Sequence, residues 1–408
     1  MKKAPGTDRL TGVMPDIGFR SPVFHSPLTY DSHISFAACD TTPGGGIDSV
    51  AEGLYESAAD ALTADSQPVN LSSEFGGNII AKALSYIGKQ TNLLIDTYYT
   101  IVLDGPYSMD VVSTANIKTT NAVITLVGKT PAKIRSYGDA WLFWIEDGTL
   151  VLGNNITLSP SYYSGGVRVD GSSAALIMQD GAAITRNIDN AGSGSGVVVH
   201  GGSFDMNGGT IFGNTSGGVV VYGGSFDMSG GTISGNKGSG VVVDGGNFTM
   251  SGGTISGNSS YSYGGGVNVC GGSFTMDGGT ISGNTAPSYG GGVFISGGNF
   301  DMSGGIISGN VSSSSYGGGG VYVYTGGSFA KTGGIIYGSE ETGSDKEGNP
   351  LKNITSQGDA WGHAVRYIDG SSIPFYYRDV TLDKDDNIST TGPFPAVSGE
   401  SLGNWTRR

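Results

Sequence analysis

The segment GGSFDMSGGTISGN at Gly223–Asn236 decides the fold, because near copies of it recur along the chain. Successive copies begin 22, 22, 26, 26 and 29 residues apart, at Gly201, Gly223, Gly245, Gly271, Gly297 and Gly326. Self-similarity at such a period indicates a solenoid or an array of repeated units. Collagen is excluded, because the glycines come in pairs and not at every third residue.

Two columns of the aligned copies are uniformly aliphatic and lie two residues apart. The first contains Val197, Val219, Val241, Val267, Val293 and Val321, and the second contains Val199, Val221, Val243, Val269, Ile295 and Val323. The column between them is mixed. Alternation of this kind predicts a short strand whose uniform columns face inward.

The quoted segment supplies two more strands by the same reasoning. Phenylalanine and methionine alternate with polar residues in the first, and an isoleucine column marks the second. The inward aromatic column is Phe204, Phe226, Phe248, Phe274, Phe300 and Phe329. The last strand ends in a column of amides that can hydrogen-bond between coils, namely Asn214, Asn236, Asn258, Asn284 and Asn310.

Three short strands within about 22 residues, separated by Gly-Gly corners, predict one coil of a parallel β-helix. A single coil cannot bury its inner face, whereas coils stacked about 4.8 Å apart pair each strand with its copy above and below. The sequence therefore predicts an all-β solenoid with three short strands per coil and like residues stacked on like. Short helices are expected near its N-terminal end.

The chain divides into four predicted parts. Residues 1–69 show no repeat and include a helical pattern over about 47–63. Residues 70–96 are predicted to be a helical N-terminal cap, with Ile80, Leu84 and Ile87 on one face. Residues 97–340 form the β-helix, with regular repeats over 197–338, and residues 341–408 form a C-terminal coil and cap.

The charge distribution argues against nucleic-acid binding. The formal net charge is −14, and Lys237 is the only lysine or arginine between Asn187 and Lys331. A nucleic-acid binder needs a basic stripe that displaces counterions. The sequence also contains no apolar run long enough to span a membrane. No apolar segment follows Lys2 and Lys3, so no secretion signal is expected at this start, which leaves an intracellular protein or an internal start within a longer exported chain.

The unit SFTMDGGTISGNTAPSYGGGVFISGGNF at 273–300 resembles the GGTISGN repeats of large spirochaetal surface proteins. It is more distantly similar to the repeats of chlamydial polymorphic membrane proteins. The resemblance covers about 70–408 and includes YTIVLDGPYS, WLFWIEDGTLVLGNNITL, KTGGIIYGSE, GHAVRYIDG, YYRDVTLD and GNWTRR. It implies a right-handed, pectin-lyase-like β-helix, an extracellular or outer-membrane-associated location, and an adhesive or structural role without catalytic residues.

Parallel β-helices also carry polysaccharide lyases and hydrolases, so the fold leaves an enzyme open as an alternative. A lyase needs a basic residue, and the repeats contain almost no lysine or arginine. A glycosidase needs two carboxylates about 5–9 Å apart, and Asp205 and Asp227 should lie on adjacent coils. A solvated outward column is the favoured interpretation of this pair, and a weak cation site is the less favoured one.

Other patterns give no sign of a cofactor or metal. The histidines have no metal-ligand spacing. Asp383–Asn387 (DKDDN) lacks the glycine and glutamate of a calcium loop and is interpreted as a polar turn. Cys39 and Cys270 are expected to be free thiols.

The loop between the asparagine column and the next valine strand changes length along the chain. It has four residues at 215–218 and 237–240, eight at 259–266 and 285–292, and ten at 311–320. The longer loops carry Tyr261, Tyr263, Tyr289 and Tyr316 among serine and glycine, a composition suited to adaptable contacts. They are candidate binding loops, and the alternative is that the tyrosines cover a corner. The favoured hypothesis is a non-enzymatic surface protein that contacts a host or community protein or glycan.

Overall fold

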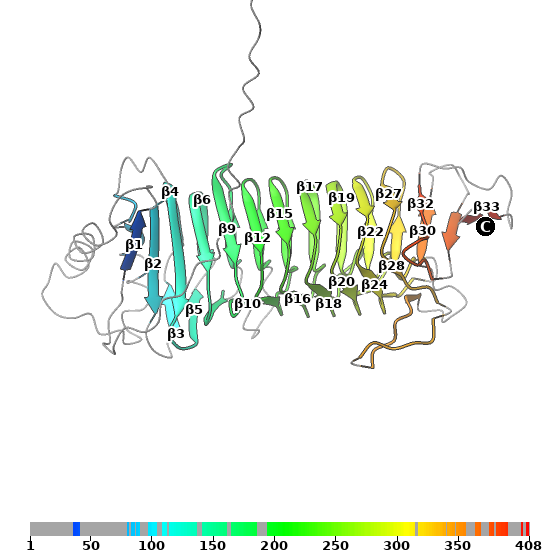
Figure 1. Cartoon of the computed structure of the whole chain (residues 1–408), viewed down its shortest axis with the longest axis horizontal. Helices are drawn as coiled ribbons and strands as arrows, with labels where there is room; N and C mark the ends of the chain where they lie inside the picture. The colour runs from blue at the N-terminus through cyan, green and yellow to red at the C-terminus, as the bar shows by residue number, and fades with distance from the viewer. Residues whose placement is uncertain are drawn as a thin grey trace, which may run out of the picture. The chain divides into compact units, whose positions relative to one another are not determined.

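In the computed structural model, the chain winds into a stack of parallel β-coils (Figure 1). All described residues belong to the unit that spans His33–Arg408. They are residues 36–40, 80, 83–85, 87–89, 97–103, 108–111, 114–136, 141–160, 165–185, 194–314, 317–339, 341–346, 348–355, 364–368, 375–378, 381–390, 401–402 and 405–407. The helix predicted over 47–63 lies outside these residues.

Two of the three faces belong to one large sheet. The first face contains the valine strands β8 (Val167–Val169), β11 (Val197–Val199), β14 (Val219–Val221), β22 (Val293–Ile295), β26 (Val321–Val323) and β30 (Val365–Ile368). The second contains β9 (Ala174–Met178), β12 (Ser203–Met206), β15 (Ser225–Met228), β23 (Asn299–Met302) and β27 (Ser328–Lys331). Strands β17 (Val241–Met250) and β19 (Val267–Met276) continue through the corner and contribute to both faces.

The third face is a separate parallel sheet with one strand from each coil. Its members, in chain order, are β3 (Ser108–Val111), β5 (Ala132–Ser136), β7 (Ile156–Ser159), β10 (Ala183–Thr185), β13 (Thr210–Phe212), β16 (Thr232–Ser234), β18 (Thr254–Ser256), β20 (Thr280–Ser282), β24 (Ile306–Ser308) and β28 (Ile335–Ile336). This ten-stranded sheet is called the third sheet below. Strands β21 (Thr285–Ala286) and β25 (Val311–Ser312), which lie in the lengthened loops, form a separate small sheet with β29 (Ile354–Thr355). Three strands per coil is therefore the rule, with a short fourth strand where the loops lengthen.

Like residues stack on like residues in register, and this stacking forms the core. Phe226 pairs with Phe248, and Phe248 with Phe274. Neighbouring phenylalanine rings from Phe204 to Phe329 have centroids 4.5–4.9 Å apart, and every ring is at most 1% exposed. Stacked aromatic rings at this separation add to the hydrophobic stabilisation that each gains from burial.

A buried ladder of amides follows the third sheet. From Asn236 onward, the side-chain oxygen of each asparagine accepts hydrogen bonds from the backbone and side-chain nitrogens of the asparagine one coil earlier. The ladder runs through Asn214, Asn236, Asn258, Asn284 and Asn310. It then continues to Asn353, 43 residues later in the chain, with an Nδ2–Oδ1 distance of 3.0 Å.

The glycine corners are required by both conformation and space. Gly253 has a φ of +75°, which side chains rarely adopt. A Cβ atom there would also lie 2.6 Å from the Met228 methyl carbon and 2.7 Å from the Gly230 carbonyl oxygen. Glycine at these corners therefore allows the backbones of adjacent coils to approach each other closely enough for their strands to pair.

The less regular coils before the repeats have the same construction. Within residues 97–340, which are predicted to be β-helix, the apolar runs that precede the repeats form β2 (Thr97–Leu103), β4 (Ala115–Gly128), β6 (Phe143–Leu152) and β7. Residues 80, 83–85 and 87 are helical, and Ile80, Leu84 and Ile87 are buried in the same hydrophobic core. No helix in the described part of the chain has the length and apolar character needed to cross a membrane.

Antiparallel pairing occurs at both ends of the large sheet. Strand β1 (Phe36–Asp40) pairs antiparallel with β2. At the other end, β31 (Phe375–Arg378) pairs with β30, β32 (Ile388–Ser389) with β27, and β34 (Trp405–Arg407) with both β31 and β33 (Ser401–Leu402), all antiparallel. A change from parallel to antiparallel pairing covers strand edges that another chain could otherwise extend.

Candidate functional site

A cleft of about 850 Å³ lies on the outer side of the third sheet. Its floor includes the outward side chains of β18 and β20, which are Thr254, Ser256, Thr280 and Ser282. Inward Ile255 and Ile281 separate the outward residues along each strand and fix their direction. Because Thr254 pairs with Thr280 and Ser256 with Ser282, the hydroxyls form two parallel rows.

The cleft becomes more apolar toward the C-terminal coils. Ile306 on β24 takes the place of threonine in the same row, and Tyr337 follows β28. Pro350 and Leu351 also line this end. The floor over β18 and β20 therefore offers hydroxyls, and the C-terminal end of the cleft offers aliphatic and aromatic carbon.

The wall of the cleft is a hairpin-like segment of which residues 341–346 and 348–351 are described, the orange loop beside β24 and β28 in Figure 1. Ser344 and Pro350 form an antiparallel bridge, and the Leu351 backbone N–H donates to the Gly343 carbonyl oxygen at 3.1 Å. The segment is tied to the sheet because the Gly309 N–H donates to the Leu351 carbonyl oxygen at 2.8 Å.

The tip of this segment uses its own acidic side chain to hold its shape. The Asp345 carboxylate accepts from the Asn349 backbone N–H at 2.7 Å and from its side-chain Nδ2 at 2.9 Å. Of the described residues that line the cleft, Asp345 and Lys346 are the charged ones, so their formal charges cancel. The described lining therefore combines hydroxyls that can form hydrogen bonds with apolar carbon and carries no net formal charge.

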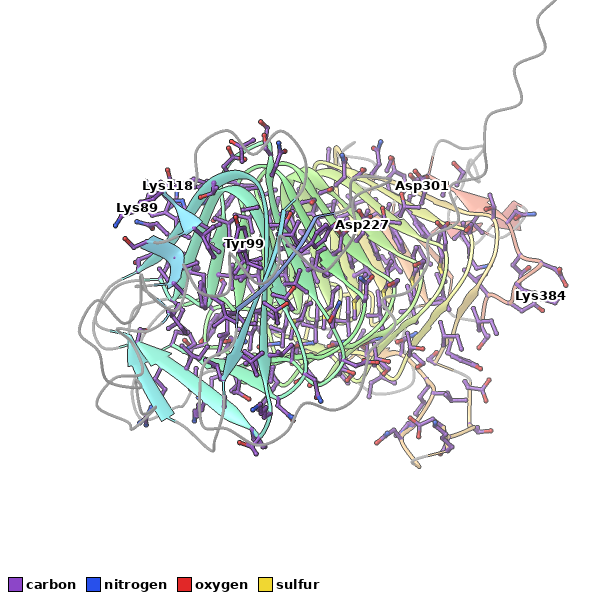
Figure 2. The ribbon with its side chains drawn as sticks, turned by 60° about the vertical axis from the view of Figure 1, so that its left-hand side comes forward. Lys89, Tyr99, Lys118, Asp227, Asp301 and Lys384 are labelled. Carbon is purple, nitrogen blue, oxygen red and sulfur yellow. The ribbon has the colours of Figure 1, made fainter. Side chains whose placement is uncertain are left out.

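The acidic pair Asp205 and Asp227 lies on the second face of the large sheet. The two residues are direct register partners on β12 and β15. Asp205 is half-buried, and burial, followed in importance by the neighbouring Asp227 carboxylate, raises its pKa. The next two residues in this column are Thr249 and Thr275, and Asp301 comes after them, so the acidic column is interrupted. Figure 2 labels Asp227 and Asp301 along the coils.

Two of the candidate tyrosines pack on the outside of the valine strands. The Tyr263 ring lies 4.7 Å from the Phe294 ring, and the Tyr289 ring lies 4.6 Å from the Tyr322 ring, centroid to centroid. Phe294 and Tyr322 occupy outward positions, which the alternation predicts to be accessible, yet they are 5% and 1% exposed. The tyrosine loops fold over this face, so each ring covers an outward aromatic residue one coil ahead.

Tyr261 differs from these two, because it is 72% exposed. Its hydroxyl donates to the Thr215 carbonyl oxygen at 2.9 Å, which positions the ring over earlier coils. Tyr316 lies outside the described residues. Among the described candidate tyrosines, Tyr261 therefore offers the largest accessible ring.

The polar turn predicted at Asp383–Asn387 encloses a lysine ammonium. Lys331 takes the place of methionine in the inward column and is fully buried. Its Nζ donates to the carbonyl oxygens of Asp383 and Asp386. Lys384, on the same turn, is exposed and is labelled at the C-terminal end in Figure 2.

Metal-binding clusters are not found in the described part of the chain, where no three His, Cys, Asp or Glu side chains are grouped to hold an ion. Cys270 is a free cysteine at the surface. Partial burial of its thiol, followed in importance by the nearby Asp244 carboxylate, raises the pKa of the thiol. The His200 ring stacks on Tyr222, with centroids 4.9 Å apart.

Sequence reasoning missed the cleft. From the sequence, 341–351 is predicted only as part of a C-terminal coil and cap. The available signal was the long step from Asn310 to Asn353, which leaves room for an inserted segment that returns to the sheet. Comparisons with protein-family models, curated proteins and solved structures give no match to this chain.

Proposed function

We propose that the protein is a non-enzymatic β-helical repeat protein of the cell surface or extracellular space, which binds a partner through elements that interrupt its repeats. The cleft on the third sheet is the observation that carries this proposal. Its floor includes repeated hydroxyls, and Asp345, the carboxylate among the described lining residues, accepts hydrogen bonds from Asn349. Such a site offers hydrogen bonds but no pair of groups arranged to transfer protons.

The repeats themselves support a scaffold role. The phenylalanine, isoleucine and asparagine columns are buried and contact their own copies in adjacent coils, so these side chains are unable to contact a partner. Among the described residues that take no part in this stacking, the cleft, Tyr261 and the lengthened loops are the candidate contact sites. The resemblance to spirochaetal surface proteins supports an adhesive role and an external location.

Binding to immobilised host-matrix proteins and glycans tests this proposal. Shortening 259–266, 285–292 and 311–320 to the four-residue length of 237–240 tests the loops. Tyr261→Ala is the sharper variant, because the exposed ring contributes little to the core, whereas Tyr289→Ala removes a packed ring and serves as its stability control. A wild-type protein that binds no surface, matrix protein or glycan contradicts the proposal.

A carbohydrate-active enzyme is the second candidate, and the raised pKa of Asp205 favours it. A carboxyl group with a raised pKa beside a second carboxylate is the arrangement that a glycosidase acid requires. The double variant Asp205→Asn, Asp227→Asn tests this candidate. If wild-type protein releases reducing ends from a polysaccharide and the double variant does not, the enzyme is supported.

A further inference from the structure

We propose that the cleft between the third sheet and segment 341–351 binds an unbranched neutral polysaccharide, with its chain crossing the strands and one sugar unit over each coil. This inference rests on the proposed binding function and specifies its ligand. It is carried by the periodicity of the floor, by the way charge is distributed around the cleft and by the absence of free backbone edges there.

Periodicity gives the direction of the ligand. Thr254 and Thr280 lie in one row and Ser256 and Ser282 in the other, with each step equal to one coil, about 4.8 Å. An extended chain of pyranose sugars advances by a similar distance per unit and presents hydroxyls at each step. A hydroxyl both donates and accepts, so threonine and serine rows can pair with sugar hydroxyls in either sense.

The far end of the cleft completes the match to a sugar. Ile306, Leu351 and the Tyr337 side chain supply carbon surface. Pyranose rings carry C–H groups on their faces and hydroxyls around their edges, so they need this combination of apolar and polar contacts. From β18 to β28 the floor crosses three coil steps, roughly 14 Å, which accommodates a segment of three or four sugars.

Charge selects neutral over acidic polysaccharides. The described lining has one acidic and one basic residue, and the chain as a whole has a net charge of −14. A polyuronate would be repelled by this net negative charge, and the described lining has no row of basic residues to compensate. A neutral chain has no such penalty.

The backbone of the floor argues against a peptide ligand added as a strand. Strand β18 pairs with β16 and β20, and β20 pairs with β18 and β24, so both edges of each strand are already occupied. Peptides that bind by strand addition require a free edge. Strands β18 and β20 therefore leave no edge with which a peptide strand could pair.

Titration calorimetry with neutral gluco-, manno- and xylo-hexasaccharides tests the inference, with an oligogalacturonate as the acidic arm and gelatin as the polypeptide arm. The cleft variant carries Thr254→Val, Thr280→Val, Ser256→Ala and Ser282→Ala. The control carries Thr210→Val, Thr232→Val and Ser234→Ala, three changes of the same kind on coils that do not line the cleft, where Phe212 occupies the fourth position. Unfolding curves confirm that both fold, and Tyr337→Ala provides a second variant at the apolar end.

We expect wild type and the control to bind at least one neutral hexasaccharide equally, and the cleft variant to bind it at least about tenfold more weakly. Equal binding by the cleft variant overturns the inference. So does a preference for galacturonate or gelatin, and so does the failure of wild type to bind any neutral hexasaccharide. Loss of binding in Tyr261→Ala alone, with the cleft variant unaffected, overturns the cleft assignment and leaves the proposed surface function intact.

Discussion

The side-chain Nδ2 of Asn258 donates to the side-chain oxygen of Asn284 at 2.9 Å, and the Asn258 backbone N–H donates to the same oxygen at 3.0 Å. The Asn258 side-chain oxygen in turn accepts from Asn236, and its Nδ2 also donates to the Ile233 carbonyl oxygen at 3.0 Å. One buried amide thus joins three coils. Hydrogen bonds between fully buried groups of this kind are costly to break, because no water replaces them.

Replacing Asn258 with alanine should therefore lower the free energy of unfolding by about 2–4 kcal/mol, since it leaves several buried groups of neighbouring coils without partners. Chemical denaturation measures the change. Ser256→Ala, two residues away and outward, is the control and should change stability by less than about 0.5 kcal/mol. Equal small effects of both variants would show that the ladder does not stabilise the stack.

Replacing Phe274 with alanine should cost about 3–5 kcal/mol, because it removes a buried ring and leaves a cavity. The ring lies 4.8 Å from Phe248 and 4.5 Å from Phe300, so both stacks are lost. Thr275→Ala, at the adjacent outward position, is the control for denaturant unfolding. A loss below about 1 kcal/mol for Phe274→Ala is incompatible with a close-packed phenylalanine column.

The buried ammonium of Lys331 should hold the turn at 383–386 against the last regular coil. In Lys331→Met the methionine column continues, but the carbonyl oxygens of Asp383 and Asp386 lose their donor. We expect faster hydrogen exchange over 381–390 and lower stability, and no such change in Lys384→Met, whose side chain is exposed. Unchanged exchange over 381–390 contradicts an anchoring role for Lys331.

Lys331 also predicts a pH dependence. Burial lowers its pKa from the usual lysine value, although the carboxylates of Asp386, Asp383 and Asp385 partly oppose this. Between the lowered native pKa and the unfolded value of about 10.4, the unfolded state binds more protons, so the free energy of unfolding rises with pH. Wild type should gain stability relative to Lys331→Met as pH increases through that window, and a relative loss would contradict the lowered pKa.

The Asp205–Asp227 pair predicts a dependence of the opposite sign. The raised native pKa of Asp205 means that the folded state holds this proton more tightly than the unfolded chain does. Stability should fall as pH rises from about 3.9 through the raised pKa, and Asp205→Asn should remove that fall. In Asp227→Asn, carboxyl NMR titration should show an Asp205 pKa that moves toward the usual value without reaching it, because burial is the larger cause. An unaltered titration would show that the two carboxyls do not interact.

The regular core could be predicted from the sequence because each side chain packs on its own copy. The aligned Phe226, Phe248 and Phe274 indicate both which side chains face inward and which residues pair between coils. No information on long-range contacts is needed to predict this part of the core. The early strands followed from their apolar runs. Segments that contact a different kind of residue are harder to predict from the sequence. Tyr263 packs on Phe294 one coil ahead, and this contact depends on how the loop folds back over the strands.

The cleft could not be predicted for the same physical reason. Its floor repeats, but its wall is a single insertion whose return to the sheet is fixed by Asn353 and by the Leu351 carbonyl oxygen. The sequence of 341–351 does not indicate which face of the coils this segment covers. Lys331 likewise replaces methionine at a single position of the inward column. Its hydrogen-bond partners lie more than fifty residues later in the chain, so the pattern of the repeats does not predict them.

The most direct test of the account measures binding and reducing-end release by wild-type protein on the same set of neutral and acidic polysaccharides. A non-enzymatic binder is expected to retain at least one neutral polysaccharide while releasing no reducing ends above a no-protein control. Release of reducing ends that disappears in the Asp205→Asn, Asp227→Asn double variant would contradict the account and establish an enzyme on this fold.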